Sequence, residues 1–313
     1  MTKKSTIQEA ARILVKGELV AFPTETVYGL GANAFDTMAV ARIFETKERP
    51  SFDPLIVHIC EIDQLADVYS GHDERVYKLA EKFWPGPLTM VLPKTKKVPD
   101  IVTSGLETVA VRMPDNPVAL QLIKEAKTPL SAPSANKFGR VSPTEADHVR
   151  KQFPGLYVID GGKTKVGIES TVITLHEDGF KILRPGIITA EELKTILPQS
   201  ANTDTTLNAP GLLKSHYSPE KPIYISDDPC HEFGDTQNAG LISFGKPEKD
   251  CGFNKIEVLS ETKNLREAAA NLFSAMHKLD DADIEFIVAE ALPQEGIGIA
   301  IMNRLTKAAY RNK

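Results

Sequence analysis

The chain has 313 residues, 42% of them hydrophobic and 25% charged, and its formal net charge at pH 7 is -5. A single hydrophobic core usually stops growing at about 250–300 residues, so two domains are expected. The acidic balance argues against the broad basic surface on which nucleic-acid affinity depends, and no apolar run approaches the roughly 20 residues of a membrane span. We therefore expect weak or no direct nucleic-acid binding and no membrane segment.

The first 200 residues alternate between helix and strand patterns. Ser5 and Gln8 form a capping-box pair before an apolar helical stripe, which Gly17 ends. Short apolar runs predict strands at residues 19–22, 55–59, 88–92, 109–113, 157–159, 172–175 and 182–183. Helical patterns lie at residues 38–45, 74–83, 117–126 and 191–197. The alternation indicates an α/β fold, and the clustering of strands after residue 150 indicates a mixed sheet.

The pattern changes over residues 198–222, which are polar, contain Pro and Gly, and lack apolar periodicity. A second alternation follows, with strands predicted at residues 223–225, 241–244, 256–259 and 284–290 and helices at residues 264–279 and 298–310. We expect a larger domain at residues 1–200, a linker at residues 201–222 and a smaller α/β domain at residues 223–313.

The cysteines give a hint about the compartment. Cys60, Cys230 and Cys251 are odd in number, far apart and in no C-x-x-C pair, which argues against a disulfide framework and against a zinc site. Residues 1–22 also lack the apolar stretch of a secretory signal. We therefore expect a soluble, unprocessed protein in the reducing cytoplasm.

Three short polar segments stand where a ligand site is expected. They are Pro-Thr-Glu-Thr-Val-Tyr-Gly-Leu at residues 23–30, Lys-Glu-Arg-Pro at residues 47–50 and Ser-Ala-Pro-Ser-Ala-Asn at residues 131–136. The first and third follow predicted strands, and ligands of open α/β sheets bind beyond the carboxyl ends of strands. Hydroxyls of Thr24, Thr26 and Tyr28 could point into such a site. The alternative is an ordinary loop for each segment.

The second segment carries two cations. Lys47 and Arg49 would point to the same side of an extended segment, which Pro50 favours by biasing its predecessor away from helix. Two aligned cations suit a triphosphate. A solvated helix end, where Lys and Arg are common, is an equally good interpretation.

Charged side chains within or after strand patterns need partners. Arg112 lies inside an apolar strand pattern, and burying it without a carboxylate is costly. The carboxylate could belong to the protein or to a substrate. Arg184, at another strand end, carries the same ambiguity, whereas a histidine at a strand end, such as His58, is more often simply hydrogen-bonded than functional.

Other common motifs are lacking. The spacing of residues 240–246 matches the first part of a P-loop, but Pro247 replaces the Ser or Thr that holds magnesium, and the segment has a strand pattern. There is no G-x-G-x-x-G, G-x-S-x-G or H-E-x-x-H. The sequence does not indicate a dinucleotide-binding fold or a hydrolase with a covalent or metal mechanism.

Several segments, taken in order along the chain, resemble the YrdC-like threonylcarbamoyl-AMP synthase family in its two-domain form. They are the three polar segments and residues 209–211 (Ala-Pro-Gly), 216–219 (His-Tyr-Ser-Pro), 303–305 (Asn-Arg-Leu) and 307–309 (Lys-Ala-Ala). The resemblance implies a mixed twisted sheet with helices, followed by a smaller Rossmann-like α/β domain. It implies a nucleotidyltransferase that converts L-threonine, bicarbonate and ATP, with Mg²⁺, into threonylcarbamoyl-AMP and pyrophosphate. The product would serve tRNA threonylcarbamoyladenosine modification, which a separate downstream tRNA threonylcarbamoyl transferase completes.

The resemblance also assigns residues. The threonine-binding set is Thr24, Tyr28, His58, Arg112 and Ser170, and the ATP-binding set is Lys47, Arg49, Asp53, Thr108, Ser134, Asn136, Ser142 and Arg184. Lys47, Arg49 and Arg184 would act in catalysis by stabilising charge on the phosphates, Tyr217 would be a lid, and no protein ligand is assigned to the metal. Many relatives have Asn in place of Asp53, whose carboxylate would repel phosphate unless Mg²⁺ lies between them or the side chain turns away.

Two other functions fit parts of the pattern. One is a tRNA- or double-stranded RNA-binding module of YrdC-like fold, which the acidic composition disfavours. The other is a carbamoyl transferase of the hydrogenase-maturation kind, which carries an additional zinc-finger region that three isolated cysteines cannot form.

Overall fold

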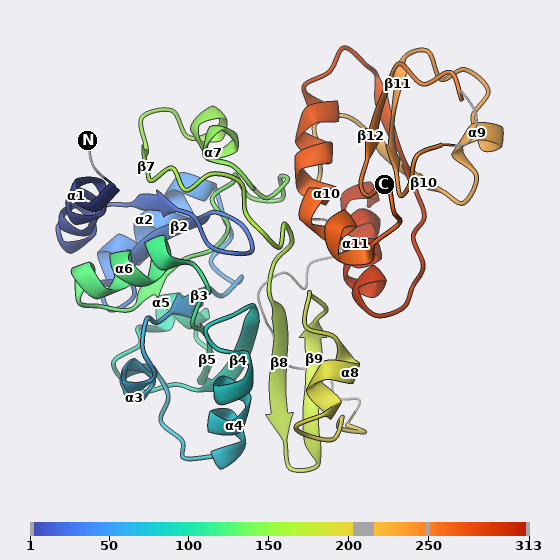
Figure 1. Ribbon diagram of the computed structural model, residues 1–313. Helices are drawn as coiled ribbons and strands as arrows, with labels where there is room; N and C mark the ends of the chain where they lie inside the picture. Colours follow the sequence, from blue (N-terminus) through green and yellow to red (C-terminus); the bar gives the residue numbers. More distant parts are fainter. Residues whose placement is uncertain (1–2, 203–215, 248–250, 311–313) are drawn as a thin grey trace.

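The computed structural model describes residues 3–202, 216–247 and 251–310 and contains two β-sheets (Figure 1). The larger sheet belongs to the first 184 residues and has nine strands in the order β7-β1-β2-β6-β3-β5-β4-β8-β9. The smaller sheet belongs to residues 223–290 and has four strands. Within the described ranges, no helix is both long and apolar enough to cross a membrane.

The larger sheet mixes parallel and antiparallel pairs. Its strands are β1 Val20–Phe22, β2 Gly29–Asn33, β3 Ile56–His58, β4 Leu88–Pro93, β5 Thr108–Arg112, β6 Leu130–Ser131, β7 Tyr157–Val158, β8 Thr171–His176 and β9 Gly179–Arg184. The parallel pairs are β1 with β7, β3 with β5 and β4 with β8, and the other neighbours are antiparallel. The register of β3 and β5 places His58 beside Arg112.

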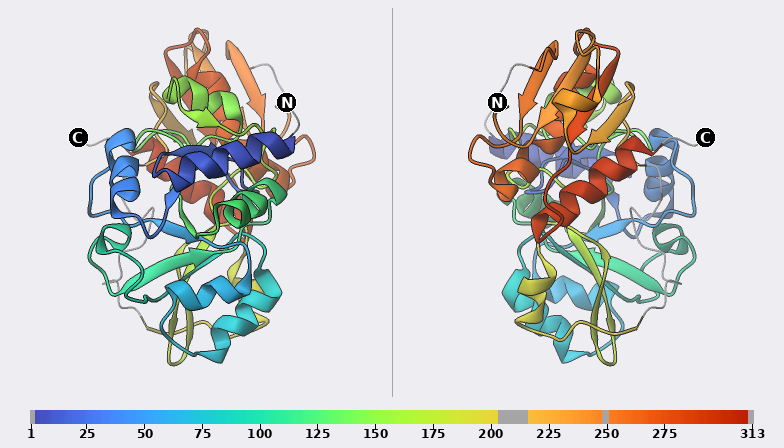
Figure 2. Two further views of the ribbon diagram at one scale, coloured as in Figure 1. Left: turned by 90° about the vertical axis from the view of Figure 1, so that its left-hand side faces the viewer. Right: turned by 90° about the vertical axis from the view of Figure 1, so that its right-hand side faces the viewer.

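Helices cover both faces of the larger sheet. They are α1 Lys3–Val15, α2 Thr37–Lys47, α3 Leu65–Val68, α4 Glu74–Phe83, α5 Asp100–Thr103, α6 Pro117–Ala126, α7 Ala146–Gln152 and α8 Ala190–Lys194, with a 3-10 turn at Ile62–Gln64. The helices α1 and α6 pack side by side (Figure 2, left). Their apolar residues form one cluster with Val20 and Phe22, whereas Ala21 belongs to the cluster that contains residues of α2 and α4. This division follows the alternation of side chains along a strand.

The smaller sheet is wholly parallel, in the order β10-β13-β11-β12. Its strands are β10 Ile223–Ser226, β11 Ala239–Ser243, β12 Lys255–Val258 and β13 Phe286–Glu290, and its helices are α9 Pro229–Glu232, α10 Leu265–Asp280 and α11 Ile297–Ala309. Asn264 caps α10 by accepting hydrogen bonds from the backbone of Arg266 and Glu267. The expected mixed sheet and smaller α/β domain are confirmed.

One apolar cluster joins the part of the chain that contains the larger sheet to residues 223–310, the C-terminal half. Residues of α10 and α11 pack with Val27, Val141, Ile168 and Ile187, which belong to loops around the larger sheet. Tyr217, close to the start of the C-terminal half, lies in the same cluster. The C-terminal half therefore packs against loops that connect elements of the larger sheet, and its α10 also meets α7 through His277 and His148.

The sequence patterns missed the short strand β2, whereas the strand expected just before residue 131 corresponds to β6. Strand β2 contains Gly29 and Gly31, which have low strand propensity. A Cβ on Gly31 would lie 2.7 Å from the ring of Phe22, so glycine is required where β2 pairs with β1. Of the expected linker, residues 203–215 lie outside the described residues.

The expectation for the cysteines is wrong for one pair. Cys230 on α9 and Cys251 before β12 form a disulfide, with their Cα atoms 4.9 Å apart. Cys60 is free. Sequence spacing alone could not show that the two segments, 21 residues apart, lie against each other.

Candidate active site

A cavity opens where several strands of the larger sheet end and where Tyr217 approaches them. Its lining residues fall within the stretches 24–29, 49–58, 132–134 and 169–184, not all of whose residues reach the cavity, together with Arg112 and the pair His216 and Tyr217. Eight of the predicted site residues line it: Thr24, Arg49, His58, Arg112, Ser134, Ser170, Arg184 and Tyr217. Segments from six regions of the sequence thus meet in one place.

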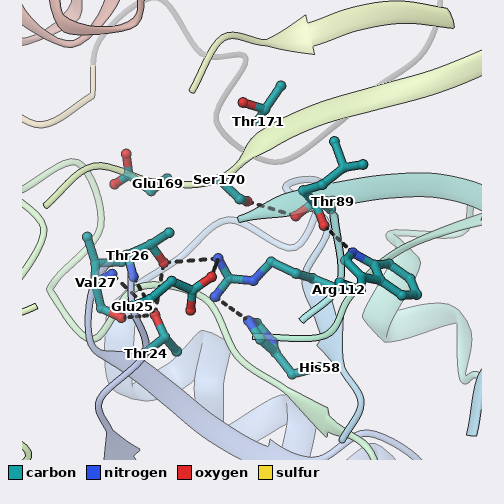
Figure 3. A network of polar contacts seen from close by, with 12 residues as sticks. Thr24, Glu25, Thr26, Val27, His58, Thr89, Arg112, Glu169, Ser170 and Thr171 are labelled. Carbon is teal, nitrogen blue, oxygen red and sulfur yellow. Dashed lines mark hydrogen bonds and ion pairs between the residues drawn. The ribbon is translucent and has the colours of Figure 1, made fainter. Parts of the chain in front are cut away.

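Arg112 is the central cation of the cavity and is buried (Figure 3). Its Nη1 donates a 3.0 Å hydrogen bond to Thr26 Oγ1, and the same nitrogen lies 3.5 Å from Glu25 Oε1. Its Nη2 lies 3.3 Å from His58 Nε2. Within the described ranges, Nε of Arg112 and both carboxylate oxygens of Glu25 lack a hydrogen-bond partner. The guanidinium therefore keeps hydrogen-bonding capacity beside the cavity.

His58 is neutral and accepts a hydrogen bond. Burial, assisted by the nearby Arg112, holds the pKa of His58 well below its usual value. Its Nδ1 faces the backbone oxygen of Ile56 at 3.3 Å, which assigns the ring proton to Nδ1 and leaves Nε2 as the acceptor for Arg112.

Thr24 organises the loop after β1. Its Oγ1 donates to the backbone oxygen of Val27 at 2.6 Å and accepts from the backbone nitrogens of Thr26 and Val27, each at 3.2 Å. Such side-chain to backbone bonds fix a tight turn. This turn places Thr26 against Arg112.

Ser170 and Arg184 form a second polar group in the cavity. Ser170 Oγ lies 2.7 Å from Thr89 Oγ1 (Figure 3). Arg184 donates from Nε and Nη2 to the backbone oxygen of Ser170 at 3.1 and 3.0 Å. Burial lowers the pKa of Arg184. The last residue of β9 is thereby held against the segment that leads into β8.

Arg49 lines the cavity with Asp53 beside it. Nη2 of Arg49 lies 2.9 Å from Oδ2 of Asp53, and both side chains are buried. Arg49 also donates to the backbone oxygens of Asp53 and Pro54. Asp53 itself does not line the cavity, so its carboxylate is turned toward Arg49.

Lys47 lies behind the cavity wall. Its side chain is only 1% exposed, and Nζ donates to the backbone oxygens of Ser134 and Asn136. Burial and the proximity of Arg49 hold the pKa of Lys47 well below its usual value. The Nζ atom therefore fixes the loop at residues 131–136, whose Ser134 reaches the cavity.

Four further predicted residues do not line the cavity. Tyr28 donates to the backbone oxygen of Gly162, and Asn136 donates to two backbone oxygens of its own loop. Thr108 begins β5, at the opposite end from Arg112. Ser142 Oγ donates a 2.5 Å hydrogen bond to Glu169 Oε1 and so touches the cavity only through that residue.

Sequence reasoning missed Glu169, whose carboxylate is buried and lines the cavity. Burial alone would raise the pKa of Glu169, but Arg304 and Arg184 together lower it. The signal available was an acid directly before Ser170. Its partner Arg304 lies 135 residues away, at a distance that no local pattern reveals.

Tyr217 closes one side of the cavity and is fully buried. Its ring lies 5.4 Å from that of Phe273 on α10. Burial first, and the nearby Glu169 second, raise the pKa of Tyr217 to about 12. The phenol is therefore uncharged at neutral pH.

A metal ion would find few ligands here. Within the described ranges, no group of three or more His, Cys, Asp or Glu side chains could hold one.

Comparisons with known proteins agree along the chain. Residues 12–186 match the family model described as "Telomere recombination", and residues 188–310 match the one described as "Threonylcarbamoyl-AMP synthase, C-terminal domain". The chain is 42% identical to the threonylcarbamoyl-AMP synthase of Pyrococcus abyssi, over 97% of this chain and 94% of that protein. It is also 42% identical to the threonylcarbamoyl-AMP synthase of Bacillus subtilis, over 98% and 94%. The crystal structure of P. abyssi Sua5 complexed with L-threonine covers 99% of this chain and 95% of its own, at 41% identity and a TM-score of 0.88.

Proposed function

The chain belongs to the threonylcarbamoyl-AMP synthase family, and from this premise we propose how its cavity binds the substrates and promotes the reaction. The enzyme is a nucleotidyltransferase that makes threonylcarbamoyl-AMP, and the full-length similarity favours this function over an RNA-binding module. The substrates would be L-threonine, bicarbonate and ATP, and pyrophosphate would be released. The product would pass to a tRNA threonylcarbamoyl transferase in the cytoplasm.

Arg112 carries the assignment of the threonine subsite. It is a buried cation whose Nε lacks an acceptor within the described part of the chain, and it lines the cavity. A carboxylate is the ligand that satisfies such a guanidinium best. Because His58 is neutral, the pair of His58 and Arg112 carries a single positive charge, which matches one carboxylate. Thr24 and Ser170 line the same space and would contact the rest of the amino acid.

Arg49 and Arg184 would bind the phosphates of ATP. Both line the cavity, and so does Ser134 of the loop at residues 131–136, whose hydroxyl could also contact ATP. Cations fixed in place before the reaction stabilise the charge that develops during phosphoryl-type transfer. Lys47 would support this subsite by holding the Ser134 loop.

The reaction needs no nucleophile from the protein. The amine of threonine forms an N–C bond with the carbon of bicarbonate, which loses a C–O bond so that a carbamate and water result. A carbamate oxygen then attacks the α-phosphorus of ATP, and the bond to pyrophosphate breaks. The protein would contribute positioning and charge stabilisation. Mg²⁺ would arrive with ATP, held mainly by phosphate oxygens as is common for this ion.

Other predicted residues would act indirectly. Asp53 would set the orientation of Arg49 and not contact ATP, because the two side chains pair with each other. Tyr28, Asn136 and Ser142 would hold loops of the site through the hydrogen bonds described above. Thr108 begins β5 and does not line the cavity, and its contact with ATP stays a prediction. Tyr217 would act as a lid that shields the carbamate from water.

These contacts support the division of the chain that the sequence predicts. Residues 1–200 would form the catalytic domain, residues 201–222 the linker that carries the lid, and residues 223–313 the smaller domain. The candidate substrate-binding residues belong to the first of these, apart from Tyr217.

The first experiment measures pyrophosphate release by the purified chain with ATP, Mg²⁺ and bicarbonate, with and without L-threonine. We expect release to depend on threonine and a mass matching threonylcarbamoyl-AMP to appear. A folded protein that releases no pyrophosphate would refute the proposal, and salt-dependent RNA binding in its place would favour the binding-module alternative.

A further inference from the structure

A side chain from the C-terminal half reaches the wall of the cavity. Arg304 lies on α11, the helix near the upper ends of β8 and β9 in Figure 1, and its side chain is fully buried. Its Nε donates a 3.0 Å hydrogen bond to Oε2 of Glu169, which lines the cavity. Arg304 is therefore a direct contact between the C-terminal half and the candidate active site.

The same guanidinium holds two backbone segments. Its Nη2 donates to the backbone oxygen of Glu169 at 3.3 Å, and its Nη1 donates to the backbone oxygen of Pro185. Glu169 precedes Ser170 and Pro185 follows Arg184, and both of these neighbours line the cavity. One buried side chain thus fixes both segments that carry polar groups of the site.

Glu169 and Arg304 extend this arrangement to two more parts of the site. Oε1 of Glu169 accepts the hydrogen bond from Ser142. Cζ of Arg304 lies 5.5 Å from the centre of the Tyr217 ring, within the range of a cation–π contact. The backbone oxygen of Ser142 lies 3.1 Å from Nε2 of His277 on α10. Helices of the C-terminal half therefore hold the cavity wall at several points.

The charge of the Arg304–Glu169 pair indicates a role beyond packing the C-terminal half against the larger sheet. Away from the cavity, α10 and α11 meet the loops of the larger sheet through an apolar cluster and through exposed polar contacts such as Lys163 with Asn271, which suffice for packing. Burying a guanidinium and a carboxylate together costs desolvation energy that two apolar residues would avoid. The charged pair occurs where this interface meets the cavity, and its hydrogen bonds have the directional character that positioning requires.

We propose that Arg304 is a positioning residue of the active site, through which the C-terminal half sets the places of Glu169, Ser170 and Arg184. The proposal rests on the proposed function. It gives the C-terminal half a part in the reaction without placing any of its residues against a substrate.

The test compares threonine-dependent pyrophosphate release by the full-length wild type and four variants: Arg304→Met, Arg304→Lys, Glu169→Gln and the double variant R304M/E169Q. Lys163→Met is the matched control, because Lys163 donates a 2.7 Å hydrogen bond to Asn271 of α10 but does not line the cavity. Circular dichroism and thermal unfolding check that each variant is folded at the assay temperature.

We expect Arg304→Met to lower kcat/KM for threonine at least tenfold and Lys163→Met to stay within twofold of the wild type. Arg304→Lys should fall between them, because a lysine keeps the positive charge but cannot hold Glu169 and Pro185 in the same fork. The double variant should regain part of the loss, since a neutral amide at position 169 needs no buried cation.

The pH profile separates positioning from simple loss of stability. Without Arg304, which lowers the pKa of Glu169, that carboxyl group binds a proton more readily, so the defect of Arg304→Met should shrink as the pH falls. The double variant has no carboxyl group at position 169, so its activity relative to the wild type should not show this dependence on pH. The charged or titratable groups that face Glu169 in the wild type are Arg112, Arg184, His216, Tyr217, Arg304 and Lys307.

Three outcomes would overturn the inference. They are wild-type kinetics in folded Arg304→Met, a double variant no more active than Arg304→Met, and, if Arg304→Met does not fold, wild-type kinetics in Arg304→Lys. A wild type that releases no pyrophosphate would instead refute the proposed function, and the inference would fall with it.

Discussion

At the scale of single residues, Arg112 connects the structure to substrate choice. It is buried beside neutral His58, and its nearest carboxylate, in Glu25, is 3.5 Å away and outside the cavity lining. A carboxylate ligand could therefore approach the guanidinium without displacing a strong hydrogen bond to the protein. This arrangement supports the proposal that Arg112 binds the carboxylate of threonine.

Replacing Arg112 tests that recognition. We expect Arg112→Lys to raise the KM for threonine roughly 10- to 100-fold, because hydrogen bonds between charged groups contribute about 1.5–3 kcal/mol each. The KM for ATP should change much less, since Arg49 and Arg184 are retained. Steady-state kinetics with each substrate varied in turn measures both values. Equal effects on both substrates would contradict the assignment.

The sequence was informative for residues whose chemistry conflicts with their local pattern. Arg112 stood out because it interrupts an apolar strand, and the structure brings it to the cavity with Ser170 and Arg184. Glu169 was missed, since its partner comes from a helix 135 residues away. Lys47 was interpreted as a phosphate ligand or a solvated helix end; its burial and its hydrogen bond to the Ser134 loop contradict the solvated end, and the phosphate contact stays a prediction.

At the scale of elements, the end of α2 determines the shape of the neighbouring loop. The helix starts at an Asp36 cap, which accepts hydrogen bonds from Met38 and Ala39, and ends with Glu48 in the left-handed conformation. This length places Lys47 in the last turn, from which Nζ reaches the Ser134 loop. A helix terminus thus positions a loop that lines the cavity.

Lys47→Met therefore has two expected effects. Losing Nζ leaves two buried backbone oxygens without their donor, which should lower the free energy of unfolding by about 1–3 kcal/mol. The KM for ATP should rise as the Ser134 loop loosens. Urea unfolding and ATP kinetics measure the two effects. Lys137→Met is a suitable control, because Lys137 is exposed and pairs with Glu48 on the surface. Loss of ATP binding with unchanged stability would indicate direct phosphate contact instead.

The elements themselves were largely predictable. Helices α4 and α6 have the bounds that their periodicity predicts, because a cap opens each and an apolar stripe runs through it. Strand β2 was not, since its two glycines leave no strand signal. The disulfide between Cys230 and Cys251 depends on packing within the smaller domain, which spacing does not encode.

At the scale of the whole molecule, the contact between the halves depends on uncharged histidines. His148 on α7 and His277 on α10 stack with ring centres 3.9 Å apart. Burial, together with His148, lowers the pKa of His277 to about 3. Burial also lowers the pKa of His148. Two cations cannot stack at this distance without strong repulsion.

This pair predicts a loss of stability in mild acid. In the unfolded chain a histidine takes up a proton near its ordinary pKa of about 6.5, whereas folded His277 does not until about pH 3. Stability should therefore fall as the pH drops below about 6.5, by up to about 1.4 kcal/mol per pH unit for this residue. Urea unfolding between pH 7 and 5 should show a smaller fall in His277→Gln than in the wild type. An identical fall in both would exclude His277 as the cause.

The apolar cluster between the halves has a consequence for handling the protein in pieces. Val27, Val141, Ile168 and Ile187 are at most 6% exposed because α10 and α11 cover them. A fragment that ends after residue 200 would expose these apolar side chains to water near its own cavity. Such an exposed apolar patch favours self-association. Loss of activity in such a fragment would then report aggregation as much as the absence of Arg304, and for that reason point variants of the intact chain are the cleaner probe.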